Sequence, residues 1–579
     1  MSLFRCEQLY GEIEMRKKRV IFCMILIIVL FGILALRMVD LQVLGGELME
    51  KAARELGSRS ETVSAVRGEI LDRNSEVLIT NESAFYLTVY PSADDETLAK
   101  VSKIINKQIT KDDASDGQPF IFASNIEKGQ AAAIMEQGFS GVEVRDSYVR
   151  KALGVKLSHV AGTVGSITEE EYTGGGYKLS DKTGKNGIEK FAERYLKGTD
   201  GEKTTGFDGK ITETAAKDGC YTELCIDKKL QKKCEDELKR AVDEVNKTKK
   251  TEGGGAAVVI DVKNGDVLAM CSYPDYNIEN YAENYDALLA DKRNPLLDRC
   301  ISGKYEPGSV YKPSVALAAL SEGAVTAEEK IEDKGVYKYY APSYTPSCYI
   351  WTNKHITHGR VNVSEALSVS CNYYFYEAGR RLGIEKTAEY GRDFGLGELC
   401  GIELEGEGQG VVASPATKKD WVAGDTLQAA IGQSVNMFTP LSLARYTAAI
   451  ANGGYVYKPH IVKKIAEYGG KTEYERKTEL VRTVKLKKEY YDAVREGMKL
   501  CCESGTAAEE FSGKNFSAGG KTGTAQVPEG PDNGLFIGFA PFENPEIAVC
   551  VVIEHGSGTH APRAASEIMS EWIVNSGNR

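Results

Sequence analysis

The sequence has no surplus of positive charge. Its 579 residues include 72 Lys and Arg against 83 Asp and Glu, which gives a formal net charge of −11. Proteins that grip phosphate backbones need a basic face, so we do not expect this chain to bind nucleic acid. The hydrophobic content of 42% and charged content of 27% also exclude a disordered chain. We expect a globular protein, and its length requires at least two domains.

Closely spaced cysteine pairs are lacking as well. The 13 cysteines are spread along the chain, without the dense pattern of a disulfide scaffold or the paired CxxC clusters of structural zinc sites. Most should therefore be small core residues. Cys348, His355, His358 and Cys371 could converge on a zinc ion, but their spacing matches no standard zinc finger. Local packing is the expected role of these four residues, and zinc binding is the alternative.

One long apolar segment lies near the N-terminus. Residues 20–36 (VIFCMILIIVLFGILAL) carry no charge and would form a helix of about 25 Å, close to the length that crosses a bilayer. No small-x-small cleavage site follows the segment, so we expect an uncleaved anchor over residues 20–37. Residues 16–19 (RKKR) precede the segment, while only Arg37 lies just beyond it. This asymmetry predicts a cytoplasmic head of residues 1–19, with the remainder of the chain outside.

Beyond the anchor, the sequence pattern changes near residue 222. Residues 38–221 are polar and rich in strand-forming segments, whereas residues 227–245 carry apolar side chains at helical spacing. Residues 256–262 and 267–272 flank an Asn-Gly pair, which predicts a β-hairpin.

The C-terminal part predicts two more strands, over residues 536–542 and 547–554, and a closing helix over residues 564–574. We therefore predict an α+β fold with three parts beyond the head. These are the transmembrane helix, an elongated strand-rich domain over residues 38–221, and a domain over residues 222–579 with an antiparallel sheet between helical regions.

A serine and a lysine stand one helical turn apart in residues 306–313 (EPGSVYKP). Pro313 has no N–H and fits only in the first turn of a helix, so the helix must begin close to Ser309. Lys312 lies on the same face and could take the proton of Ser309 if burial or a second cation lowers its pKa. The pair is a candidate nucleophile and base. Taken alone, the pair is explained better by a capping serine followed by an ordinary surface lysine.

Two further motifs add to this pair. Ser370 and Asn372, in residues 368–372 (SVSCN), offer a hydroxyl that can relay a proton and an amide that can hold a substrate amide. Residues 519–526 (GGKTGTAQ) place Lys521 between glycines, which let a strand approach a ligand closely while the lysine faces a carboxylate. A phosphate-binding Walker loop would need glycine at position 515, which is asparagine, so that site is excluded.

Ser-x-x-Lys, Ser-x-Asn and Lys-Thr-Gly in this order are the motif set of penicillin-binding proteins and serine β-lactamases. From anchor to C-terminus, the chain resembles a class B penicillin-binding protein, a monofunctional peptidoglycan D,D-transpeptidase. Residues 67–74 (RGEILDRN) and 187–189 (GIE) resemble signatures of that family's pedestal, or dimerisation, domain. Ser75 stands where the family often has glycine. Residues 38–221 would be the pedestal and residues 222–579 the transpeptidase domain.

The resemblance implies roles for the serine, lysine and amide residues. Ser309 would attack the penultimate D-Ala carbonyl of a stem peptide, and Lys312 would accept its proton. Ser370 would relay a proton to the leaving D-Ala, and Asn372 would hold the substrate amide. An amine from a neighbouring stem peptide would then attack the acyl-enzyme and form the cross-link, with no metal or organic cofactor.

The resemblance also implies a substrate-binding strand. Lys521 and Thr522, with Gly523 and Thr524 beside them, would bind the terminal carboxylate of the peptide or of a β-lactam antibiotic. The backbone N–H groups of Ser309 and Thr524 would form the oxyanion hole, which an anionic tetrahedral intermediate requires.

Three other functions remain to be weighed. A β-lactamase needs a base for deacylation, and no Glu-x-x-Leu-Asn element occurs between Asn372 and Lys521. A β-lactam sensor would need a signalling domain larger than the 19-residue head. A non-catalytic scaffold of the wall-building complex would be expected to have lost Lys312 or Lys521, and both are present.

The resemblance further implies a partner. Class B relatives pair with a SEDS-type glycan polymerase in the membrane, through the anchor and the pedestal. Residues 372–376 (NYYFY) and 424–427 (GDTL) look more like the elongation type of this family than like its septal or sporulation types.

Overall fold

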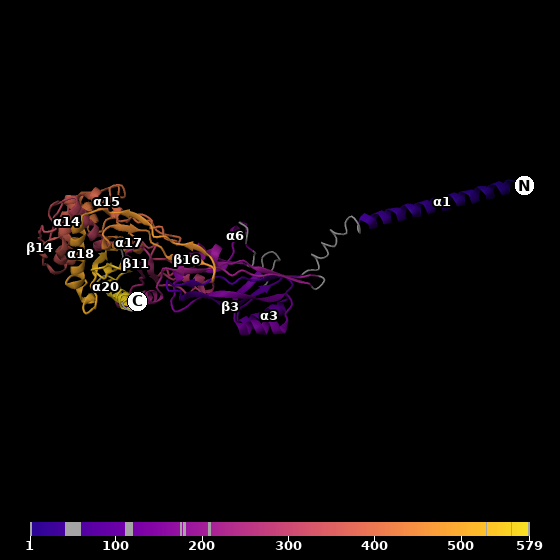
Figure 1. Cartoon of the computed structure of the whole chain (residues 1–579), viewed down its shortest axis with the longest axis horizontal. Helices are drawn as coiled ribbons and strands as arrows, with labels where there is room; N and C mark the ends of the chain where they lie inside the picture. The colour runs from indigo at the N-terminus through magenta and orange to yellow at the C-terminus, as the bar shows by residue number, and fades with distance from the viewer. Residues whose placement is uncertain are drawn as a thin grey trace. The chain divides into compact units, whose positions relative to one another are not determined.

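The computed structural model describes residues 3–40, 59–109, 120–173, 177, 181–206, 210–527, 530–556 and 558–576 (Figure 1). Its contacts group the chain into two units. The first comprises Met1–Val66 and Gly198–Asp218, and the second comprises Arg67–Lys197 and Gly219–Arg579.

The first unit contains the N-terminal helix and a small sheet. Helix α1 (Leu3–Val39) includes a stretch, Glu14–Val39, that is long and apolar enough to cross a membrane, and the predicted anchor falls within it. This helix is consistent with a single-pass membrane anchor. The sheet is antiparallel in the order β1 (Arg59–Val63), β8 (Gly201–Thr205), β9 (Ile211–Thr214).

The second unit holds a sheet that draws strands from three parts of the chain. Its order is β17-β16-β10-β2-β3-β4, and β5 also pairs with β3. The strands are β2 (Ile70–Leu71), β3 (Val77–Val89), β4 (Phe120–Ile126), β5 (Val142–Ala152), β10 (Tyr221–Leu224), β16 (Val462–Ala466) and β17 (Thr472–Glu475). Strand β10 runs parallel to β2 and antiparallel to β16. Segments on both sides of residue 222 therefore share one sheet.

A buried ionic cluster joins the two pedestal-like signatures in this unit. The Glu189 carboxylate accepts from Arg67 Nε at 2.7 Å and from Arg150 Nε at 2.6 Å, and Arg67 also pairs with Glu193 at 2.6 Å. Burial alone would raise the pKa of Glu189, but the two guanidinium groups hold it below its usual value. Removing one partner of such a buried cluster typically costs about 3–5 kcal/mol, so the residues 67–74 and 187–189 depend on each other.

The predicted hairpins lie in a five-stranded antiparallel sheet in the same unit. Its order is β12-β11-β21-β20-β19. The first hairpin is β11 (Gly255–Asp261) with β12 (Val267–Tyr273), and the C-terminal one is β20 (Asn533–Ala540) with β21 (Ile547–Ile553). Both agree with the predicted segments to within three residues at each end. Strand β19 (Gly519–Ala525) forms one edge of the sheet.

Each face of this sheet is covered by helices. Ala257 and Val259 of β11 pack in one core with α9 (Lys228–Lys249) and α20 (His560–Ser576). Ala256, Val258 and Ile260 point into a second core with α11 (Lys312–Ser321) and α17 (Pro440–Ala451). Because neighbouring side chains of a strand face opposite ways, a strand buried on both faces is apolar, as β11 is from Gly255 to Ile260. The mixed α+β fold is confirmed.

The remaining elements complete the second unit. Those before β10 are α3 (Asp95–Ile105), α4 (Lys128–Gln137), α5 (Ser158–Ala161), β6 (Val164–Ser166), α6 (Glu169–Thr173), β7 (Lys182–Gly184), α7 (Gly187–Phe191) and α8 (Glu193–Leu196). Those after β12 are α10 (Tyr281–Ala290), η3 (Gly308–Tyr311), α11 (Lys312–Ser321), β13 (Ile331–Asp333), α12 (Tyr349–Lys354), β14 (Gly359–Val361), α13 (Val363–Ser368), α14 (Asn372–Leu382), α15 (Ile384–Asp393), α16 (Ala423–Ala430), α17 (Pro440–Ala451), β15 (Tyr455–Tyr457), β18 (Leu480–Thr483), α18 (Lys488–Glu503) and α19 (Ala508–Phe511).

The cysteines are mostly core residues, as predicted. Among the residues that the structure describes, eleven cysteines are buried, Cys23 of α1 is exposed, and none forms a disulfide.

Candidate active site

Ser309 lies in the short 3-10 turn η3, directly before helix α11. Pro313 occupies the first turn of α11, as its missing N–H requires. Gly308 has a φ of +52°, and a Cβ on it would lie 2.4 Å from the carbonyl oxygen of Thr524. Only glycine fits there, so the turn that carries the half-buried Ser309 packs directly on the backbone of β19.

Lys312 joins the serine turn to the Ser-x-Asn segment. Its Nζ donates to the Ser370 carbonyl at 2.9 Å, to Ser370 Oγ at 3.2 Å and to Asn372 Oδ1 at 2.7 Å. Ser370 adopts a left-handed conformation with φ of +57°, between the end of α13 and the start of α14. The fold thus brings Lys312, Ser370 and Asn372 together.

The two lysines of the site are fully buried, and this changes their protonation. Burial, and after it the charge of Lys521, together lower the pKa of Lys312 from 10.5 to about 7. Burial also lowers the pKa of Lys521, to about 8. Near neutral pH, Lys312 can therefore lose its proton while Lys521 keeps its charge. A neutral amine is suited to act as a general base. The hydroxyl that Lys312 contacts is that of Ser370, and Ser309 lies one turn before the lysine.

Strand β19 presents its Lys-Thr-Gly-Thr segment at the edge of the sheet. Lys521 lies on the covered face and donates to the Thr522 carbonyl at 3.0 Å. A Cβ on Gly523 would lie 2.9 Å from the Pro307 carbonyl oxygen, so this glycine makes room for the serine turn. Thr522 is half-buried and Thr524 is exposed. An incoming ligand can reach the two threonines, whereas Lys521 acts from beneath the surface.

Thr506 is a site residue that the sequence analysis missed. Its hydroxyl lies 2.6 Å from the hydroxyl of Thr522, and its backbone N–H donates to the Ser368 carbonyl at 3.2 Å. It therefore ties Thr522 of β19 to the end of α13. No local motif marks this threonine, because its partners become neighbours only in the folded chain.

A second cluster lies next to the Ser-x-Asn segment and has the donors of a metal site. One ligand atom from each of Asp333, Cys348, His358 and Cys371 lies within 4.8 Å of the others. His358 Nδ1 is 2.9 Å from Asp333 Oδ2 and 3.6 Å from Cys348 Sγ. Asp333 stands in place of His355 of the alternative zinc set, and His355 packs its ring against Trp351.

The chemistry of these donors fits zinc. Two sulfurs, one imidazole nitrogen and one carboxylate oxygen make a four-coordinate set of the kind that Zn²⁺ occupies in proteins. A hydrogen bond from Cys371 lowers the pKa of the Cys348 thiol, which favours the thiolate that a metal requires. Cys371 stands between Ser370 and Asn372, so a metal held here would brace that segment.

Comparisons with known proteins match two domain families to the chain. Residues 255–573 match the penicillin binding protein transpeptidase domain, and residues 62–221 match the penicillin-binding protein dimerisation domain. The chain is 28% identical to the peptidoglycan D,D-transpeptidase MrdA of Haemophilus influenzae, over 97% of this chain and 92% of that one. It is 30% identical to the stage V sporulation protein D of Bacillus subtilis, over 94% of this chain and 82% of that one.

Two solved structures are similar over nearly their whole length. The complex of PBP2 with MreC from Helicobacter pylori matches with a TM-score of 0.73 and 26% identity, over 90% of this chain and 99% of that one. A chain of a peptidoglycan synthase complex that coordinates polymerisation and crosslinking matches with a TM-score of 0.72 and 26% identity, over 96% of this chain and 98% of that one.

The pKa values of the two lysines predict a bell-shaped pH dependence for acylation by a fluorescent penicillin. The rate should rise as Lys312 loses its proton near pH 7 and fall as Lys521 loses its charge near pH 8. Lys312→Arg should slow acylation by about 10²–10⁴-fold, because arginine does not give up its proton.

Lys304→Arg is the control, since Lys304 is exposed and lies five residues before Ser309. It should keep the wild-type profile. A wild-type rate that does not change between pH 6 and pH 9, or a Lys312→Arg rate within tenfold of wild type, would remove Lys312 from the role of base.

The donor cluster predicts bound zinc. The full-length protein in detergent, saturated with Zn²⁺ and then dialysed, should keep about one zinc per chain by elemental mass spectrometry. Cys348→Ala should lose most of it, whereas Cys400→Ala, which removes a buried thiol outside the cluster, should not. Equal zinc contents in the two variants would contradict the site.

Proposed function

The chain belongs to the penicillin-binding protein family of transpeptidases, and we propose that it cross-links peptidoglycan through an acyl-enzyme on Ser309. Within that family it is a serine-type peptidoglycan D,D-transpeptidase. The observation that carries the assignment to Ser309 is the buried Lys312, which lies one turn from the serine and has its pKa lowered to about 7. We also propose the division into a pedestal over residues 38–221 and a transpeptidase domain over residues 222–579.

Acylation begins when Ser309 Oγ attacks the penultimate D-Ala carbonyl of a stem peptide and Lys312 takes the hydroxyl proton. The backbone N–H groups of Ser309 and Thr524 stabilise the oxyanion of the tetrahedral intermediate. The close packing of Gly308 on Thr524 supports this pairing. When the C–N bond breaks, the proton passes from Lys312 through the Ser370 hydroxyl to the nitrogen of the departing D-Ala. The contact of 3.2 Å from Lys312 Nζ to Ser370 Oγ supports this route.

The stem peptide lies along the free edge of β19. An edge strand offers unpaired N–H and C=O groups to an extended peptide, which adds as a further strand. Thr522 and Thr524 receive the terminal carboxylate, and the buried charge of Lys521 adds electrostatic attraction. Asn372 holds a substrate amide. An amine from a second stem peptide then attacks the acyl-enzyme carbonyl, releases Ser309 and forms the cross-link.

A β-lactam follows the same first step and stops there. Its ring opens on Ser309, and the attached product blocks the site. The chain is thus a target of β-lactams, and neither a β-lactamase nor a non-catalytic scaffold accounts as well for a site with both lysines in place.

We place the catalytic domain outside the cell membrane, with residues 1–19 in the cytoplasm. The basic residues 16–19 before the span, against Arg37 after it, support this orientation. The elongation type fits best, because MrdA relatives and PBP2 structures match along the chain. The sporulation relative, at 30% identity, makes sporulation the second candidate role.

A membrane-embedded SEDS-type glycan polymerase is the proposed partner. The similar synthase complex couples polymerisation and crosslinking, and the similar PBP2 is bound to MreC. A cross-linker of nascent strands must be held where those strands emerge. We assign this contact to α1 and the membrane-proximal part of the pedestal.

A stable penicillin adduct on Ser309 is the direct test of the proposed activity. Peptide mapping of the labelled wild type should find the adduct on Ser309, and Ser309→Ala should abolish it. Ser343→Ala, which removes an exposed hydroxyl of the same domain, should label normally. An adduct elsewhere would overturn the mechanism, and one that hydrolyses within seconds would indicate a β-lactamase. A membrane-impermeant probe should also label intact spheroplasts if the domain lies outside.

The anchor is the part to test for the partner. Replacing residues 20–36 with an unrelated transmembrane helix should weaken co-purification with the polymerase, while penicillin labelling of Ser309 stays intact. Undiminished co-purification and polymerase activity after the swap and after deletion of the pedestal would contradict the proposed contact.

A further inference from the structure

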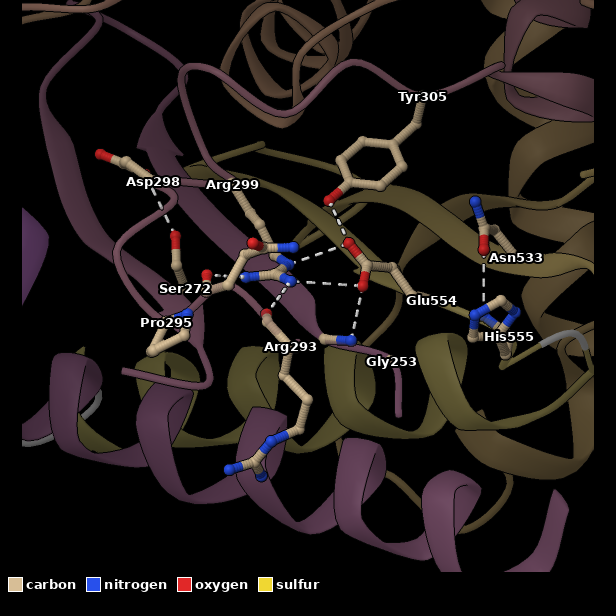
Figure 2. A network of polar contacts seen from close by, with 12 residues as sticks. Gly253, Ser272, Arg293, Pro295, Asp298, Arg299, Tyr305, Asn533, Glu554 and His555 are labelled. Atoms are coloured by element: carbon tan, nitrogen blue, oxygen red, sulfur yellow. Dashed lines mark hydrogen bonds and ion pairs between the residues drawn. The ribbon is translucent and has the colours of Figure 1, made fainter. Parts of the chain in front are cut away.

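A buried ionic network lies at one end of the five-stranded sheet and contains no residue of the proposed catalytic set (Figure 2). The carboxylate of Glu554 accepts from Arg299 Nε at 2.9 Å, from Tyr305 Oη at 2.9 Å and from the Gly254 N–H at 2.6 Å. The other guanidinium nitrogens of Arg299 donate to the carbonyl oxygens of Asn294 and Arg293. Figure 2 shows the Glu554 carboxylate between Arg299 and Tyr305.

The network holds the segment that leads into the serine turn. Tyr305 lies four residues before Ser309, and its backbone makes reciprocal hydrogen bonds of 2.9 Å with Phe438. Gly308 then donates to the Gly432 carbonyl at 2.9 Å. The segment is thus fixed by backbone contacts to residues 432–438, while the side chains of Arg299 and Tyr305 fix it to Glu554.

Glu554 also lies next to the residue of β21 that is in register with Thr524 across the sheet. The register pairs Thr524 of β19 with Gly534 of β20, and Gly534 with Ile553 of β21. Glu554 follows Ile553 directly, so its backbone is fixed by the sheet that presents Thr524. The carboxylate therefore ties the two halves of the proposed oxyanion hole, the serine turn and the end of β19, to one residue.

The chemistry of the network demands a carboxylate. Burial would raise the pKa of Glu554, but Arg299 and the other donors hold it below its usual value, so the group is ionised. Arg299, Tyr305 and the backbone of Gly254 all donate hydrogen bonds to the Glu554 carboxylate. A glutamine in its place would offer one acceptor oxygen, and its amide would point two N–H groups at donors.

We propose that Glu554 is a positioning residue for acylation, which through Arg299 and Tyr305 sets the place of Ser309 relative to Thr524. This inference rests on the proposed function of Ser309. Glu554 does not touch substrate; it acts on the rate of the chemical step by aligning the attacking oxygen with the oxyanion donors. Misplacement of reacting groups by about 1 Å can cost about 10²-fold in rate.

The test separates the first-order acylation rate constant from the fraction of protein that reacts. The full-length wild type and its variants, in detergent, are mixed with saturating fluorescent penicillin. The time course gives the rate constant, and its amplitude gives the folded, competent fraction. Glu554→Gln should lower the rate constant by about tenfold or more. Tyr305→Phe, which removes a single hydroxyl, should lower it by about threefold or more with full amplitude.

Glu403→Gln is the matched control. Glu403 is also a buried carboxylate that accepts a backbone N–H, from Ile461 at 3.0 Å, and it contacts His460 rather than the serine segment. The Glu403→Gln variant should acylate with the wild-type rate constant, even if the amplitude of its time course is lower. The same pattern in Glu554→Gln, a lower amplitude at an unchanged rate constant, would show a structural role only and overturn the proposal.

Tyr305→Phe keeps the test decisive if Glu554→Gln does not fold, because a wild-type rate constant in Tyr305→Phe overturns the proposal by itself. Failure of the underlying function looks different, since the wild type would then carry no adduct on Ser309.

Discussion

The site depends on the burial of two lysines, Lys312 and Lys521, in the same region of the protein. Burial disfavours the charge of both ammonium groups, and the charge of Lys521 also disfavours that of Lys312, so Lys312 loses its proton more readily. Lys312 would be an ordinary cation on an exposed helix. The helices around α11 and the covered face of β19 supply the burial that lowers its pKa, so the proposed role of Lys312 as a base depends on the packed core.

The glycines around Ser309 are the second constraint. Gly308 and Gly523 bring the serine turn and β19 together so closely that a Cβ at either position would meet backbone atoms. The two proposed oxyanion donors, the backbone N–H groups of Ser309 and Thr524, belong to these two closely packed segments. The Glu554 network holds the same two segments from the end of the sheet. Packing and polar contacts thus act on one geometric quantity, the separation of Ser309 from Thr524.

Local patterns in the sequence predicted the elements that local physics determines. The Asn-Gly hairpin, the closing helix and the start of α11 before Pro313 each follow from nearby residues, and all were found. Long-range pairings were not predictable in this way. Strand β10 joins β2 and β16, Thr506 reaches Thr522, and Asp333 stands where the alternative zinc set had His355, all through contacts between segments distant in sequence. The motifs identified the family, but they did not identify Thr506, Asp333 or Glu554, whose contacts hold the motif segments in place.

A direct measurement of the Lys312 pKa tests the central claim. In protein with ¹³C-labelled lysine, the Lys312 Cε resonance, assigned by its loss in Lys312→Arg, can be followed against pH by NMR. The account predicts a midpoint near 7 in the wild type. Lys521→Gln should raise that midpoint, because it removes the second positive charge. A wild-type midpoint near the ordinary lysine value of 10.5, or one that Lys521→Gln leaves unchanged, would contradict the account.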